Sequence, residues 1–330
     1  MAHLDITALR MFYKKQNSLI RAVDGINIHV EKGESVGIVG ESGCGKSSLA
    51  LTIFRNLPAN VGLFSGSIKL GGEELTQIER ENFRKNYRWK KMAMIPQSSM
   101  NALDPIYPVG KQMVETYLEH EDAPEREARE KTLELLREVN LPDTVFGSYP
   151  FQLSGGQKQR AMIAMSLLLD PELLIADEPT TALDVVVQAK ILKLLKKQKE
   201  SRGMTSLFIS HDMGVVSSVA QRIAVMYGGQ IVEIADAKSV FSDPLHPYTQ
   251  KLIGCIPRLG KKGSGELQFI PGSPPALNEE LKNCRFWPRC PFAMEICKQK
   301  PPALVEAKSG HFVACFLHSM ESLPAEGDTS

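Results

Sequence analysis

Short apolar runs alternate with longer amphipathic segments along the first 240 residues of the chain. Four runs have the length and composition of buried strands: SVGIVG at 35–40, AMIPQ at 93–97, LLIADE at 173–178 and TSLFIS at 205–210. Residues 185–201 carry apolar positions at helical spacing, and residues 222–234 are typical of a hairpin turning at Gly228 and Gly229. This alternation predicts an α/β domain with a mainly parallel, mixed sheet core and helices on its faces.

Two parts of the chain depart from the alternation. Residues 98–149 contain no strand-like run and carry the charged segment EHEDAPEREAREKTLELLREVN, which predicts a helical insertion. After residue 239, Pro and Gly become frequent and exclude long helices and central strands. We therefore expect a main domain over 1–240, with a helical subdomain at about 98–160. An irregular C-terminal extension over 241–330 would need staples to be ordered.

Composition narrows the class of protein. The formal net charge is +1 without a dense basic tail, which argues against a dominant nucleic-acid surface. No run approaches the roughly 20 apolar residues that span a bilayer. The first residues, MAHLDITALRMFYKK, do not have the pattern of a signal peptide. We expect a cytoplasmic chain, in which six cysteines are metal ligands, reactive groups or core residues rather than disulfides.

Residues 40–47, GESGCGKS, match the phosphate-loop pattern G-x-x-x-x-G-K-[ST] between a predicted strand and a predicted helix. Backbone N–H groups of such a loop surround phosphate oxygens, and the helix directs its positive end at the same place. We expect Lys46 to reach the outer phosphates and the Ser47 hydroxyl to bind Mg²⁺, whereas the side chain of Cys44 is incidental. The predicted nucleotide contacts are Gly40, Ser42, Gly43, Cys44, Gly45, Lys46, Ser47 and Ser48.

Two further stretches contain residues that could act on a bound nucleotide. In LLIADE, Asp177 ends a buried strand where it can hold Mg²⁺, and Glu178 follows in a position to polarise a water molecule. In LSGGQKQR, Ser154 has the character of a helix N-cap, and the helix start forms a second anion site.

The order of these motifs resembles that of ABC-type ATPases over about residues 5–235. The motifs are GESGCGKS at 40–47, LSGGQ at 153–157, LLIADE at 173–178, TALD at 181–184 and His211 after LFIS. The resemblance implies that Gln97 touches Mg²⁺ or the attacking water, that Glu178 is the catalytic base and that His211 stabilises the γ-phosphate. It also implies a head-to-tail dimer in which the signature of one subunit completes the ATP site of the other. The signature residues are Ser154, Gly155, Gly156 and Gln157, and Asp184 would couple the two sites.

An aromatic residue that stacks on adenine is expected upstream of the phosphate loop. We select Tyr13, with Phe12 as the alternative. The alternative is that this aromatic residue only packs on the first strand and has no role in binding.

Essentially the whole chain resembles the ATP-binding subunits of dipeptide and oligopeptide importers, a family shared with nickel importers. The stretches that carry this resemblance are RAVDGI at 21–26, GESGCGKSS, PQSSMNALDP at 96–105, HPYTQKLIGCIP at 246–257, IPGSPPAL and the cysteine segment. It implies ATP-driven import of short peptides by a peripheral subunit at the cytoplasmic face of the bacterial inner membrane. The implied partners are two permease subunits, a second ATPase subunit, identical or not, and an extracytoplasmic solute-binding protein. Nickel or another small solute is the alternative cargo, and a soluble ABC ATPase acting on nucleic acid is a more distant one.

Four cysteines lie in the last 50 residues, as Cys284-x5-Cys290-x6-Cys297-x17-Cys315. The spacing contains no C-x2-C pair and leaves open an iron–sulfur cluster, zinc or free thiols. The resemblance to peptide importers implies a [4Fe–4S] cluster, for which we favour a structural role over a sensing role. His311 and His318 are possible replacement ligands, and Cys255 is expected to fill a core.

Overall fold

The computed structural model describes residues 2–16, 18–97, 102–181, 183–256 and 270–319. Residues 98–101, 182, 257–269 and 320–330, which include parts of the predicted insertion, of TALD and of the extension, lie outside the described residues.

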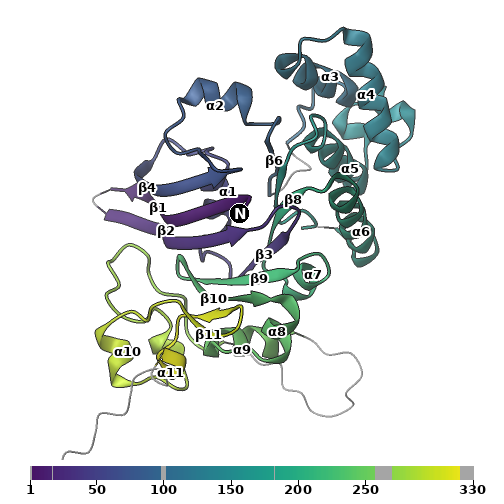
Figure 1. Ribbon diagram of the computed structural model, residues 1–330. Helices are drawn as coiled ribbons and strands as arrows, with labels where there is room; N and C mark the ends of the chain where they lie inside the picture. The colour runs from purple at the N-terminus through teal and green to yellow at the C-terminus, as the bar shows by residue number, and fades with distance from the viewer. Residues whose placement is uncertain (1, 17, 98–101, 182, 257–269, 320–330) are drawn as a thin grey trace, which may run out of the picture.

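The predicted main sheet is confirmed as the centre of the molecule (Figure 1). Its strands are β3 (Ser35–Val39), β6 (Met92–Ile95), β7 (Leu173–Asp177), β8 (Thr205–Ser210), β9 (Arg222–Tyr227), β10 (Gln230–Asp236), β11 (Val305–Lys308) and β12 (His311–Val313). They lie in the order β11-β12-β10-β9-β3-β8-β7-β6, and the five strands from β9 to β6 are parallel. The hairpin expected at Gly228 and Gly229 joins β9 to β10, with both glycines at positive φ.

A second, antiparallel sheet lies next to the first and contacts it through β2 and β10. It contains β1 (Leu4–Lys15), β2 (Ser18–Val30), β4 (Val61–Leu70) and β5 (Glu73–Glu74) in the order β2-β1-β4-β5. Helix α1 (Lys46–Ile53) contacts strands of both sheets. We did not predict the second sheet, because register shifts between β1 and its neighbours interrupt the alternation by which a strand is recognised in a sequence.

Helices form the other layers. The predicted insertion is helical, with α3 (Val109–His120) and α4 (Glu125–Glu138) packed together beside α5 (Gly155–Ser166) and α6 (Val185–Arg202) (Figure 1). The charged run expected to be helical breaks at residues 121–124, because Pro124 begins a new helix as its N-cap. Two shorter helices, α2 (Arg80–Asn86) and α7 (Met213–Ser217), lie elsewhere on the sheets.

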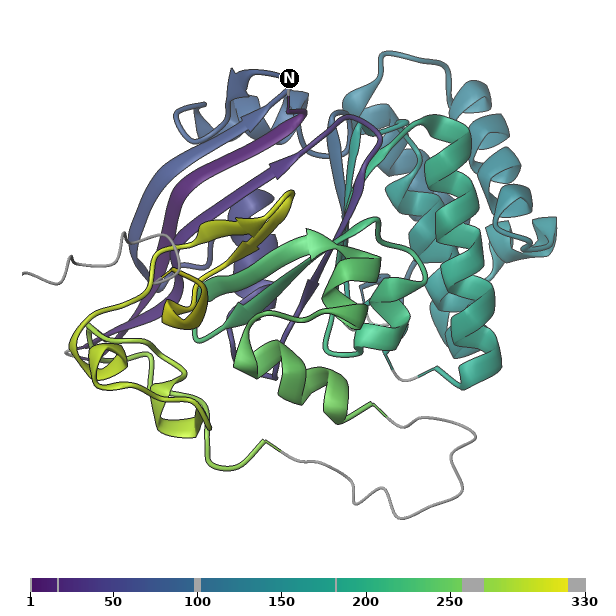
Figure 2. The same ribbon diagram turned by 60° about the horizontal axis from the view of Figure 1, so that its bottom comes forward.

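The C-terminal extension, predicted to be irregular and without long helices, contains short helices and a hairpin. Helix α8 (Ala237–Ser242) spans its start, and α9 (Pro247–Gly254), η4 (Trp287–Arg289), α10 (Glu295–Gln299) and α11 (Phe316–Ser319) follow. Its hairpin β11–β12 adds to β10 and extends the main sheet (Figure 2). This pairing satisfies backbone groups that an edge strand would leave open. No disulfide staples it, because all six cysteines are free thiols.

A buried carboxylate ties the extension to the main sheet. Glu233 on β10 is fully buried and accepts the backbone N–H of Leu245 at 2.8 Å and of His246 at 2.9 Å. His311 Nε2 on β12 lies 2.7 Å from the same carboxylate. One acidic side chain therefore joins β10, the start of α9 and the added hairpin.

We predict that Glu233→Ala destabilises the protein by about 3–5 kcal/mol, because it leaves a buried histidine and two buried N–H groups without an acceptor. Thermal unfolding and limited proteolysis of the extension would measure the loss. Asp243→Asn, which breaks an exposed pair with Lys308, is the control and should leave the unfolding midpoint unchanged. Equal midpoints for both variants would contradict the role of Glu233.

Candidate active site

The phosphate loop runs from the end of β3 to the start of α1 and is packed tightly on both sides. A Cβ at Gly40 would lie 2.1 Å from Met226 O, and a Cβ at Gly45 would lie 2.0 Å from Ala22 O. Gly45 also has φ of 107°, which disfavours other residues. Glycine is therefore required at both positions by space, and at Gly45 by conformation as well.

Lys46 lies inside this loop. Its side chain is buried, and Nζ donates to Gly40 O at 2.7 Å and to Glu41 O at 2.9 Å. The ammonium group is held by the same backbone whose N–H groups would surround a phosphate. Cys44 is also buried, with Sγ 3.8 Å from Lys46 Nζ.

Asp177, at the end of β7, lies beside Ser47. Burial raises the pKa of Asp177 to about 6, and a hydrogen bond from Ser47 opposes that rise. Asp177 Oδ1 is buried and has no hydrogen-bond partner among the described residues. An unpaired carboxylate oxygen next to a hydroxyl is a donor set that suits a hard cation, so these residues fit Mg²⁺.

Glu178 is the centre of the predicted catalytic group. His211 Nδ1 lies 3.0 Å from Oε1, and Oε2 accepts from Thr181 Oγ1 at 2.9 Å and from Gln97 Nε2 at 3.3 Å. Burial raises the pKa of Glu178, but the hydrogen bonds from His211 and Thr181 outweigh it and leave the pKa below its ordinary value. Glu178 has φ of 48°, an unusual backbone conformation for a non-glycine residue. Its backbone N–H donates to Ile209 O at 2.8 Å.

The structure thus brings Gln97, Glu178 and His211 into one cluster, as the sequence suggested. Thr181 was missed as a member of it. Its position three residues after Glu178 within TALD is the signal by which it could have been found.

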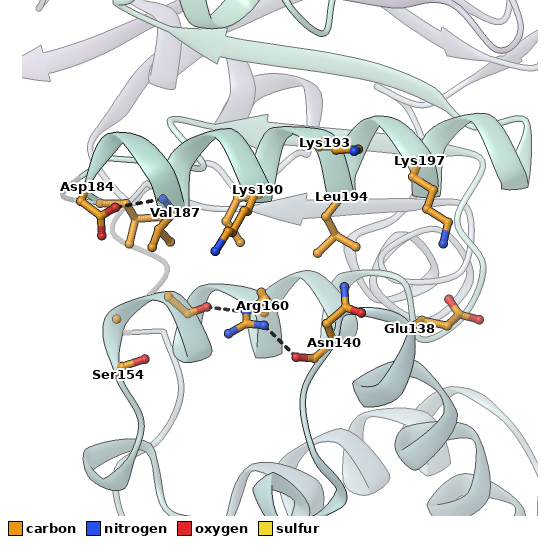
Figure 3. Close-up of a pocket in the computed structure, with 14 residues that line it drawn as sticks. Glu138, Asn140, Ser154, Arg160, Asp184, Val187, Lys190, Lys193, Leu194 and Lys197 are labelled. Carbon is orange, nitrogen blue, oxygen red and sulfur yellow. Dashed lines mark hydrogen bonds between the residues drawn. The ribbon is translucent and has the colours of Figure 1, made fainter.

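The signature residues line a different place. Ser154 caps α5, accepting from the N–H of Gln157 at 3.3 Å, while Gln157 Oε1 accepts from the Ser154 N–H at 2.8 Å. Across a groove from Ser154, Asp184 caps α6 and accepts from the N–H groups of Val186 and Val187 (Figure 3). Ser154, Gly155, Gly156 and Asp184 all line this groove, a cavity of about 790 Å³ between α5 and α6.

The two aromatic candidates differ in position. Phe12 is 3% exposed and lies beneath the guanidinium of Arg21, so its ring has no free face. Tyr13 is partly exposed, and its hydroxyl donates to Ser48 Oγ at 3.0 Å, next to the phosphate loop. The structure therefore places Tyr13, and not Phe12, where a base could contact it.

The four C-terminal cysteines line one small cavity of about 10 Å³ with Trp287, Phe292 and Phe316. The cysteines are Cys284, Cys290, Cys297 and Cys315. Burial raises the pKa of the Cys284 and Cys315 thiols to about 11. Within the described ranges, no three His, Cys, Asp or Glu side chains are arranged to hold a metal ion.

The other candidates lie outside that cavity. His311 binds Glu233, and His318 Nε2 lies 3.0 Å from Leu245 O, so neither lines it. Cys255 ends α9 and is partly exposed, which corrects the expectation that it fills a core.

Comparison with known proteins identifies the chain. Residues 23–181 match the ABC transporter family, and residues 232–297 match the C-terminal region of oligopeptide/dipeptide transporters. A probable peptide ABC transporter ATP-binding protein of Sinorhizobium fredii is 44% identical over 316 residues, covering 95% of this chain and 94% of that protein. The chain belongs to the family of oligopeptide/dipeptide ABC transporter ATP-binding proteins. As an ABC transporter ATPase, it couples ATP hydrolysis to transport.

Other members of the family are similar over their whole length. The oligopeptide transport ATP-binding protein AppD of Bacillus subtilis is 41% identical, and the match covers 96% of this chain and 97% of AppD. The dipeptide transport ATP-binding protein DppD of Caldanaerobacter subterraneus is 41% identical, and the match covers 94% of this chain and 95% of DppD. None of the helices in the described ranges is both long and apolar enough to cross a membrane.

Solved structures share the ATPase fold. A dimeric ATP-binding cassette in a post-hydrolysis state bound to ADP and Pi has a TM-score of 0.64 at 28% identity, covering 71% of this chain and 98% of that one. A cassette from Clostridium perfringens, part of an ABC transporter complex, has a TM-score of 0.63 at 26% identity, covering 73% and 91%. The predicted ABC ATPase fold, with its mixed sheet core and helical subdomain, is therefore confirmed.

For Tyr13 we predict that Tyr13→Ala weakens ATP binding about tenfold, because an aromatic contact contributes about 0.5–1.5 kcal/mol beyond its buried area. Tyr13→Phe keeps the ring and loses only the hydrogen bond to Ser48, so its affinity should stay within about twofold of wild type. Titration with a fluorescent ATP analogue measures both. If Tyr13→Ala bound as tightly as Tyr13→Phe, the ring would only pack on β1.

Proposed function

We propose that this protein is the ATP-hydrolysing subunit that powers import of dipeptides or oligopeptides through an inner-membrane ABC transporter. One observation carries the proposal: a complete hydrolytic cluster around Glu178 and an extension of the oligopeptide/dipeptide type occur in one chain. The relatives named as peptide, oligopeptide and dipeptide transport proteins support the same cargo. We assign residues 1–240 to the nucleotide-binding domain, with a helical subdomain at about 98–160, and residues 241–330 to the extension.

Hydrolysis would use the residues as follows. The N–H groups of Gly40 and of residues 42–48 bind the phosphates, and Lys46 exchanges the carbonyls of Gly40 and Glu41 for phosphate oxygens. Ser47, Asp177 and Gln97 would hold Mg²⁺, which supplies charge stabilisation at the phosphates. Glu178, fixed through one oxygen by His211, orients and deprotonates the attacking water.

The signature would act on a second nucleotide. Ser154 begins α5 on the wall of a groove separate from the phosphate loop, and the helix start favours an anion. An ATP held by the partner's phosphate loop would satisfy this site, with Gly155, Gly156 and Gln157 beside it and Asp184 linking the two sites. The dimeric state of a similar solved cassette supports this arrangement.

Import of peptides would require further subunits beside this one. The subunit would lie at the cytoplasmic face of the bacterial inner membrane, against two permease subunits. A second ATPase subunit, identical or not, would complete the sandwich dimer. An extracytoplasmic solute-binding protein would deliver the peptide to the permeases, and no nucleic acid takes part.

We predict that Glu178→Gln retains ATP binding and dimerises on ATP, yet loses at least about 10²-fold in hydrolysis, because the amide cannot accept the proton. The measurement is ATP turnover in proteoliposomes that contain this subunit with its permeases and its solute-binding protein. In the wild type, a short peptide should stimulate turnover. Nickel stimulation without peptide stimulation would reject the peptide cargo, and near-normal turnover by Glu178→Gln would reject the base assignment.

We also propose that the four cysteines hold a [4Fe–4S] cluster that staples the extension. Four free thiols on one cavity, surrounded by aromatic side chains, support it. A single zinc ion would draw thiolates to about 2.3 Å from one point. The thiolates of a cluster lie farther apart, because each binds a different iron. The cavity of about 10 Å³ is too small for the cluster, and no three metal-binding side chains in the described ranges are arranged to hold a metal, so loading would require these cysteines to rearrange.

We predict that anaerobically purified protein contains about four iron and four acid-labile sulfide per chain and absorbs near ~400 nm. Cys290→Ser should lose the iron and expose the extension to protease, whereas Cys255→Ser, outside the cavity, should retain it. One zinc without sulfide would assign the site to zinc.

A further inference from the structure

The C-terminal extension holds one residue of the phosphate loop, Glu41, at two places. The Glu41 carboxylate forms a bidentate ion pair with Arg289, whose Nη1 and Nη2 lie 2.8 and 2.9 Å from its two oxygens. The backbone N–H of Glu41 donates to the Tyr248 hydroxyl at 2.9 Å. Both partners are buried, with 4% of the Arg289 side chain and none of Tyr248 exposed. Neither partner belongs to a nucleotide motif.

Arg289 is fixed in place by other contacts. Its Nε donates to Pro271 O at 2.8 Å, and Nη2 donates to Ile270 O at 3.2 Å. Its Nη1 donates to the Tyr227 hydroxyl at 3.3 Å, and the guanidinium lies over the Tyr227 ring. A planar guanidinium held in this way can receive a carboxylate in only one orientation.

Tyr248 is equally constrained. It lies in the first turn of α9, where its N–H donates to Nδ1 of His246, the N-cap residue, at 3.0 Å. Its ring centroid is 4.5 Å from that of Tyr227 and 5.4 Å from that of Phe286. The Tyr248 hydroxyl, which accepts the hydrogen bond from the Glu41 N–H, therefore has a fixed position.

Glu41 in turn bears on the nucleotide site. Its carbonyl oxygen accepts from Lys46 Nζ at 2.9 Å, so the orientation of this peptide group affects where the lysine rests. Its carboxylate belongs to a loop that binds phosphate, and an unpaired negative charge there repels ATP. Arg289 neutralises that charge.

We propose that Arg289 and Tyr248 are positioning residues of the ATP site, through which the docked extension fixes the phosphate loop and favours ATP binding. Arg289 cancels the charge of Glu41, and Tyr248 holds its backbone. The inference concerns the ATPase alone and depends neither on the transported solute nor on a metal at the cysteines.

The test is ATP affinity in four full-length proteins: wild type, Arg289→Ala, Glu41→Gln and the double variant. Arg289→Ala leaves the Glu41 carboxylate unpaired and should raise the Kd for Mg-ATP about tenfold. Glu41→Gln removes the repelling charge, so it should bind within about threefold of wild type, and the double variant within about threefold of Glu41→Gln. In hydrolysis assays, Arg289→Ala should raise KM and leave kcat within about twofold.

A purely structural role for Arg289 gives a different result. If Arg289 only held the extension in place, the double variant would bind as weakly as Arg289→Ala, and that outcome would overturn the proposal. A Kd for Arg289→Ala within twofold of wild type would also overturn it. Lys298→Ala, which removes an exposed pair with Glu295 in the same extension, is the matched control and should match wild type.

Tyr248→Phe provides a second test that does not depend on the fold of the Arg289 variants. It keeps the ring and its aromatic contacts and removes only the hydroxyl. Hydrogen exchange at the Glu41 amide should accelerate at least about tenfold, because that N–H loses its acceptor. Arg289→Lys keeps the positive charge and should recover part of the affinity lost in Arg289→Ala. Unchanged amide exchange in Tyr248→Phe would remove Tyr248 from the proposal.

Discussion

The structure depends on the close packing of the phosphate loop between two sheets. Gly45 faces Ala22 of the antiparallel sheet, and Gly40 faces Met226 of the main sheet, at distances that admit no side chain. The Gly229 N–H also donates to Cys44 O at 2.9 Å, which ties the β9–β10 turn to the loop. Because the loop fits only when both sheets are in place, the order of strands distant in sequence decides whether the nucleotide cradle forms.

Buried polar contacts and a shared apolar cluster attach the extension to the main sheet. Glu233 joins it to β10, Arg285 pairs with Asp24 and donates to Gly228 O, and Arg289 pairs with Glu41. A buried charge without its partner is costly, whereas an intact pair is close to neutral. Undocking the extension would break these contacts together and expose the apolar cluster that Tyr248 and Phe286 share with Tyr227, so we expect it to unfold with the cassette as one cooperative unit.

The residues of the site could be predicted from local patterns, whereas contacts between distant segments of the chain could not. Strand, loop and helix at residues 35–53 could be predicted because the chemistry of Lys46 needs only its neighbours in sequence. The strands around β1 could not be predicted, because bulges interrupt their alternation of apolar and polar residues. The hairpin β11–β12 could not be predicted either, because it is short. The contact of Arg289 with Glu41 spans 248 residues and leaves no local pattern. The stretch HPYT was recognised only by resemblance. The structure supplies its physical reason, since His246 caps α9 and Tyr248 reaches Glu41.

Arg289 directly precedes Cys290 in the chain. Ligation, oxidation or alkylation of the Cys290 thiol would therefore act on the residue next to Arg289, whose guanidinium neutralises Glu41. The same adjacency bears on how the protein is dissected. A fragment ended at residue 240, where a domain boundary would be drawn from the motifs, keeps every nucleotide motif but loses both groups that hold Glu41. Such a fragment would be a poor reference for the ATP affinity of the intact subunit.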